Sequence, residues 1–60
     1  MNHAQIAQLL EAATTYMRSA AHTRNGLFLP EANPELEREL LKGALDNLRI
    51  ATKYLEDFLQ

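Results

Sequence analysis

Apolar residues recur along most of the chain at intervals of three and four positions, with polar residues between them. This spacing is typical of amphipathic α-helices, in which residues three and four apart share a face. The chain's turn signals, Asn25-Gly26 and Asn33-Pro34, lie between two such stretches. The pattern predicts an all-α antiparallel helical hairpin in a single domain, with helices over about 3–24 and 34–59 and a loop over about 25–33.

Residues at the expected helix ends support these boundaries. Asn2 is suited to cap the first helix, with Gln5 three residues later as in a capping box. Gly26 follows its expected end, because glycine adopts the left-handed conformation there without steric cost. Asn33-Pro34 predicts the start of the second helix, since asparagine caps and proline presets φ at the first helical position.

The second helix is expected to be strongly amphipathic. Charges of alternating sign occupy the face opposite its apolar one, with local pairs such as Lys53 and Asp57. We interpret that face as a solvated surface; the alternative is a charged binding face. The broad apolar face collects Leu36, Leu40, Leu41, Ala44, Leu48, Ala51, Tyr54, Leu55, Phe58 and Leu59.

The first helix has an apolar face of its own, and its remaining surface is polar but barely charged. Small uncharged side chains lose little on desolvation and let another backbone come close, so this outer face is a candidate partner-binding surface. The alternative is an ordinary exposed face of an alanine-rich helix. The candidate residues are Gln5, Gln8, Ala12, Thr15, Ser19 and His22; the apolar face comprises Ile6, Leu9, Leu10, Ala13, Tyr16, Met17, Ala20 and Ala21.

Both apolar faces are too wide for a hairpin alone. A helix that packs on one neighbour needs a stripe of roughly 100°, whereas both faces here span about 150° on a helical wheel. Leucines such as Leu41, Leu48 and Leu59, or alternatively Leu36 and Leu40, would stay exposed, each forfeiting about 1.5–3 kcal/mol of burial. We therefore expect two hairpins to share one core as a homodimeric four-helix bundle. A single hairpin docked on a larger partner fits equally well.

Length and composition also favour association. A chain of 60 residues buries a marginal core by itself, and small folds usually need a disulfide, a metal or a partner. There is no cysteine, and His3 and His22 lie far apart without ligand spacing. Association is the remaining means of stabilisation.

Charge and hydropathy restrict the location and the partners. The net charge of −2 is unlike the strongly basic surface typical of nucleic-acid binders. No apolar run approaches the roughly 18 residues that a membrane span needs. The first residues lack the basic start and apolar centre of a secretory signal. We expect a cytoplasmic protein without membrane contact.

The expected loop is unusually apolar at Leu27, Phe28 and Leu29. Loops usually run over the surface and are polar. These side chains are expected to fold back and close the end of the bundle. The alternative is an exposed anchor that inserts into a partner's pocket, as aromatic hot spots do.

No motif indicates catalysis. The chain has no cysteine nucleophile, no glycine-rich phosphate loop and no histidine–carboxylate spacing for a metal. Ser19 and His22 are three residues apart on a helix, but no third orienting group accompanies them. We expect neither an enzyme nor a cofactor.

A basic cluster is the other candidate site. An antiparallel hairpin would bring Arg18, His22 and Arg24 to the same end as Arg38 and Lys42, where a helix N-terminus adds positive partial charge. Such a cluster could hold a phosphate, a nucleotide or a nucleic-acid backbone. The alternative is ordinary surface ion pairing with nearby glutamates.

The leading hypothesis is a non-enzymatic interaction protein that binds itself and another macromolecule as a regulator or inhibitor. Size and architecture alone make the chain similar to small helical hairpins encoded by phages and other mobile elements. The alternatives are a nucleotide, anion or nucleic-acid binder and a structural subunit of a larger assembly.

Overall fold

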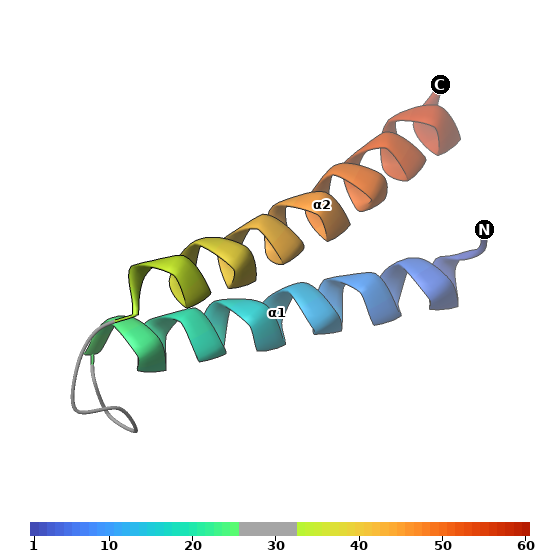
Figure 1. Cartoon of the computed structure of the whole chain (residues 1–60). Helices are drawn as coiled ribbons and strands as arrows, with labels where there is room; N and C mark the ends of the chain where they lie inside the picture. The colour runs from blue at the N-terminus through green and yellow to red at the C-terminus, as the bar shows by residue number, and fades with distance from the viewer. Residues whose placement is uncertain (26–32) are drawn as a thin grey trace.

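The protein folds as two antiparallel helices. The structure, a computed structural model, describes residues 1–25 and 33–60. Helix α1 spans His3–Asn25 and helix α2 spans Pro34–Leu59. They lie side by side with both termini at one end (Figure 1). The predicted all-α hairpin is confirmed, and the observed helix ends lie within one residue of the expected ones.

A reciprocal capping box begins α1. The backbone N–H of Gln5 donates to Oδ1 of Asn2 at 2.9 Å. The backbone N–H of Asn2 donates in turn to Oε1 of Gln5, also at 2.9 Å. Because the first N–H groups of a helix have no partner inside the helix, these bonds satisfy donors that would otherwise rely on water.

Asn33 caps α2 in the way its sequence predicts. Its backbone is extended, with φ −118° and ψ 91°, and its Oδ1 accepts the backbone N–H of Leu36 at 3.1 Å. Pro34 occupies the first helical position, where its missing N–H costs nothing. Glu35 and Glu37 follow in the first turn, where negative charge complements the helix dipole.

We expect replacement of Asn33 by alanine to destabilise the fold by about 1 kcal/mol, because the N–H of Leu36 loses its acceptor. In a chain of this size that corresponds to a fall of about 4–8 °C in Tm. Thermal unfolding followed by circular dichroism measures it. Asn33→Asp is the control, since it keeps the acceptor; equal losses for both variants would show that the cap is not the cause.

Small side chains form the seam between the two helices. Among the described residues, the buried apolar side chains are Ile6, Ala13, Ala20, Ala44 and Ala51, each at most 4% exposed. Members on the same helix are seven residues apart, so they return to the same face after two turns. Because alanine has only a methyl group, the two backbones can approach closely. No large side chain in the described part of the chain is fully buried.

Two further contacts join the helices across this seam, a hydrogen bond and a close approach of an aromatic ring to a glycine. Nδ2 of Asn47 donates to the backbone carbonyl of Leu9 at 3.2 Å and is partly buried. Gly43 lies under the ring of Tyr16, where an added Cβ would stand 3.1 Å from Cε2 of the tyrosine. Both contacts require the helices to be close, and together they fix the alignment of α1 against α2.

Larger, partly exposed aromatic side chains connect the two helices near the termini, where the two ribbons diverge (Figure 1). The ring of His3 meets those of Tyr54 and Phe58 edge-on, with centroid distances of 5.6 and 4.9 Å. A hydrogen bond also joins Nδ1 of His3 to the hydroxyl of Tyr54. Bulk at this end and alanine toward the loop account for the splay of the hairpin.

Neither α1 nor α2, within the residues described, combines the length and apolarity needed to cross a bilayer.

Candidate functional site

The most prominent surface feature is a row of exposed leucines along α2. Leu48 is 43% exposed and Leu55 is 47% exposed, although both are large apolar side chains. Leu10 and Met17 of α1 are exposed to a similar degree. We call these residues together the leucine face; it comprises Leu10 and Met17 with Leu41, Leu45, Leu48, Leu55 and Leu59.

The two helices contribute to this face on the same side of the hairpin. A groove of about 170 Å³ between them is lined by Met17, Ala20 and Ala21 of α1 and by Glu37 and Leu41 of α2. Met17 and Leu41 therefore border one groove. A helix repeats its direction about every seven residues, so the leucine face extends from them along both helices toward the termini.

Along α2 the leucine face follows a regular spacing. Leu41, Leu45, Leu48, Leu55 and Leu59 occupy positions separated by four, three, seven and four residues, and Thr52 stands at the remaining heptad position. This is the alternation of apolar residues that forms a coiled-coil seam. Helix α2 thus has two seams: alanines toward α1, and leucines toward solvent.

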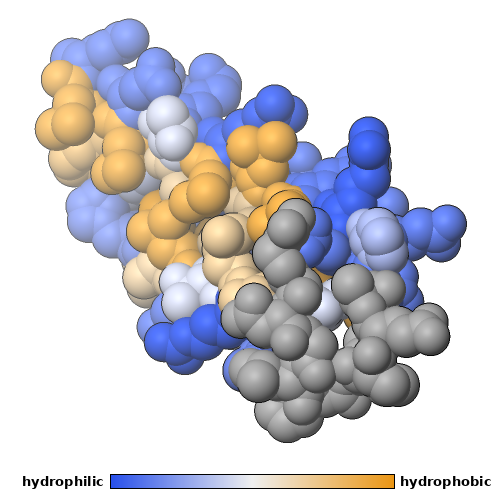
Figure 2. All heavy atoms as spheres, turned by 90° about the vertical axis from the view of Figure 1, so that its left-hand side faces the viewer, coloured by the Kyte–Doolittle hydropathy of each residue, from blue (hydrophilic) through white to orange (hydrophobic). Residues whose placement is uncertain are grey.

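The apolar surface is continuous. Figure 2, viewed from the loop end, shows hydrophobic side chains as a band that runs back along one side of the molecule. Hydrophilic side chains border the band on both sides. An exposed apolar patch with a polar rim is typical of a protein-interaction surface.

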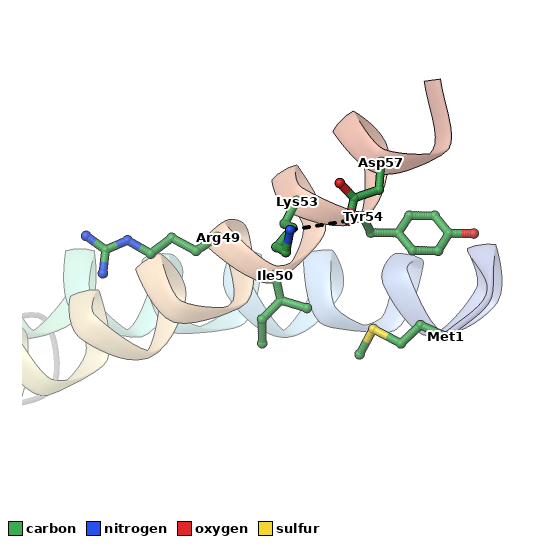
Figure 3. A pocket seen from close by; sticks show the side chains of 6 residues that line it. All are labelled: Met1, Arg49, Ile50, Lys53, Tyr54 and Asp57. Carbon is green, nitrogen blue, oxygen red and sulfur yellow. Dashed lines mark ion pairs between the residues drawn. The ribbon is translucent and has the colours of Figure 1, made fainter. Parts of the chain in front are cut away.

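A second groove lies where α2 passes the start of α1 (Figure 3). It encloses about 410 Å³ and is open to solvent. The side chains of Met1 and Ile50 project to the same side, while Lys53 pairs with Asp57 at 3.4 Å on its rim. That ion pair confirms the expected pairing on the charged face, but both partners are largely exposed, so it contributes little to stability. The groove is lined by Met1, Arg49, Ile50, Lys53, Tyr54 and Asp57.

The candidate partner-binding face of α1 is only partly open. Gln5, Gln8, Thr15 and His22 are exposed, whereas Ala12 and Ser19 are half-buried. By the helical period of about 100° per residue, this stripe lies on the opposite side of α1 from Leu10 and Met17. It is therefore a separate surface from the leucine face.

The basic residues are not brought together in one pocket of the described structure. Arg18 lies about 140° around α1 from Ala13, and Lys42 lies about 160° around α2 from Ala44. Both side chains therefore point away from the seam, and both are exposed. Arg38 lines a groove of about 480 Å³ with two glutamates and two apolar residues: Pro34, Glu35, Glu37 and Leu41. His22, also exposed, lies on the outer side of α1.

Some expected site residues fall outside the described part of the chain. These are the loop residues Leu27, Phe28 and Leu29 and the side chain of Arg24. Within residues 1–25 and 33–60, no three histidine or acidic side chains lie close enough to hold a metal ion.

Sequence reasoning missed part of the leucine face. Leu45 was not placed on the expected apolar face of α2, yet it is 45% exposed and belongs to the leucine face. The missed signal was the pair of seven-residue repeats, one of alanine at Ala44 and Ala51 and one of leucine at the positions of the leucine face. On a helical wheel the two repeats lie next to each other, so they appear as one broad apolar arc.

Comparison with known proteins gave no relatives: no protein-family profile, curated sequence or solved structure matches the chain.

Proposed function

We propose that this chain is a non-enzymatic protein-interaction module. Two copies pair through the leucine face as a four-helix bundle, and the bundle regulates or inhibits a larger macromolecule by docking on it. The observation that carries the proposal is the leucine face itself, an apolar heptad stripe that the hairpin leaves exposed. Such a stripe is stabilising only when another protein surface covers it.

The exposed apolar side chains of the described hairpin support pairing of this kind. Leu41, Leu45, Leu48 and Leu55 are each 40–47% exposed. Burial of one such side chain stabilises by about 1.5–3 kcal/mol. A second copy that covers them supplies apolar burial that the alanines between α1 and α2 do not.

A surface for another macromolecule remains after such pairing. Gln8 and Thr15 lie on the far side of α1 from Leu10, so covering the leucine face leaves them open. Their neighbourhood on α1 has few charges, which lowers the desolvation cost of a contact. We therefore assign docking on the larger macromolecule to this outer face of α1.

Self-association is tested by light scattering or sedimentation at micromolar concentration. We expect a mass of twice the 6.8 kDa of one chain. A folded monomer with full helicity would overturn the pairing and leave a hairpin that covers its leucines on a different protein.

Docking is tested by capture of the partner with tagged variants. Gln8→Arg adds a charge to the outer face of α1 and is expected to reduce the recovered partner at least tenfold, with helicity and mass unchanged. Glu39→Arg, at another exposed position on the charged side of α2, is the control and should bind as the wild type does. Equal recovery with all three proteins would remove the outer face of α1 from the proposal.

A further inference from the structure

We infer that the second copy docks with its α2 antiparallel to α2 of the first, around a two-fold axis at the level of residue 50. The two loop ends then point in opposite directions. This inference rests on the proposed self-association and adds its geometry.

The leucine spacing reads the same in both directions. The heptad positions of the stripe lie at intervals of four, three, four, three and four residues, and their midpoint is residue 50. An antiparallel copy therefore places Leu41 against Leu59 and Leu45 against Leu55, with Leu48 against Thr52. Each of these pairs joins the two different heptad positions of the stripe. Side chains arranged in this way can insert between those of the facing helix, as in a coiled coil. Every leucine of the stripe on α2 meets an apolar or threonine side chain.

Charges at the outer edge of α2 favour the same arrangement. Lys42 and Glu56 lie on the edge of the leucine face that is remote from α1, fourteen residues apart. An antiparallel copy brings Lys42 beside Glu56 of the other copy, and the two-fold axis forms this pair twice. Arg38 then lies near the C-terminal end of the other α2, where the helix dipole is negative. Arg49 meets its own copy at the axis, but its long exposed side chain can turn toward solvent.

The other two-fold arrangement fits less well. In that arrangement the two-fold axis is parallel to the helices. Every residue then keeps its position along the helix direction, which we call its height, and α2 lies against α1 of the second copy. The contacts of Asn47 with Leu9 and of Gly43 with Tyr16 define those heights. Leu41 and Leu48 would then face Met17 and Leu10, but Leu45 would face Thr14 and Thr52 would face Ala7, so two of the four pairs would lack a large apolar partner. Arg18 would also lie at the height of Lys42, where like charges repel.

Spin labels at the start of α2 distinguish the two arrangements. The chain has no cysteine, so Glu35→Cys, an exposed position opposite the seam, gives one label per copy. In the antiparallel arrangement the two labels are offset by thirty residues, or about 45 Å along the bundle. In the parallel-axis arrangement they share one end and lie within about 30 Å.

A label at Lys53→Cys is the matched control, because that position lies near the axis and gives a separation below about 30 Å in both arrangements. We expect a pulsed dipolar distance of at least about 45 Å at residue 35 and a short one at residue 53. Two short distances in a protein of dimeric mass would overturn the antiparallel geometry and leave the dimer standing. A monomeric mass would overturn the self-association as well.

Discussion

Replacement of Leu48 by glutamate is expected to dissociate the proposed dimer into monomers and to reduce the helix content of the protein. Leu48 lies in the middle of the leucine face, and the proposed pairing would bury it in both copies. Each copy loses about 1.5–3 kcal/mol of apolar burial, and each also places an unpaired carboxylate in the interface. We expect the dissociation constant to rise at least about a thousandfold, or about 4 kcal/mol. Sedimentation velocity and circular dichroism on the same sample measure both changes.

Ile50→Glu is the matched control for this experiment. Ile50 is another large aliphatic residue of α2, and it has the same 43% exposure as Leu48. It lines the groove beside Met1 and Tyr54, away from the leucine face. The control is expected to stay dimeric, because its side chain remains in solvent. If both variants dissociated alike, general exposure of apolar surface, and not the leucine face, would be responsible for association.

Replacement of Ala51 by leucine is expected to destabilise the fold by about 1–3 kcal/mol, although leucine is the more apolar residue. Ala51 is 2% exposed and lies in the seam between α1 and α2. The added carbons would meet the backbone and side chains of α1, so the helices would have to separate. The hydrogen bond from Asn47 to the carbonyl of Leu9 would lengthen in consequence. Chemical denaturation at fixed protein concentration measures the change.

Ala4→Leu makes the same substitution at an exposed position of α1. Its effect is expected to stay within about 0.5 kcal/mol, as for most surface substitutions. The comparison separates crowding in the seam from any general effect of adding a leucine. A gain in stability from Ala51→Leu would contradict the close approach of the two helices.

The helices and their starts could be predicted from the sequence because they depend on local interactions. Asn2 with Gln5, and Asn33 with Pro34, form their caps with residues at most three positions away. Such bonds have the same geometry in any helix with these residues. The same locality explains why the ion pair between Lys53 and Asp57 was expected and is observed.

The assignment of faces could not be predicted as well, because it depends on contacts between residues far apart in the chain. Leu41 and Ala44 fall on the same broad arc of a helical wheel, yet Leu41 is 40% exposed and Ala44 is 1% exposed. Which of them meets α1 depends on how closely the backbones approach. The contact of Gly43 with Tyr16 and the bond from Asn47 to Leu9 determine that approach. Neither contact appears in a pattern of apolar and polar positions.

The candidate basic cluster shows the same limit. Arg18, Arg38 and Lys42 belong to the same end of the hairpin, as their order in the sequence predicts. Their directions around each helix axis are a separate property, and these directions spread them over outward-facing surfaces. Proximity along the axis was therefore predictable, whereas convergence into one pocket required the three-dimensional structure.

The alanines in the seam between α1 and α2 make the folding of the protein depend on its concentration under the proposed pairing. With Ala13, Ala20, Ala44 and Ala51 at its centre, the seam supplies little of the apolar burial that holds small domains together. Under the proposed pairing, most of that burial comes from the second copy, so folding and association become one reaction. The folded fraction then rises with the number of chains synthesised. The expression level would therefore control whether the protein is active. Below a threshold concentration the chains would be unfolded and open to proteolysis, and above that concentration they would be assembled.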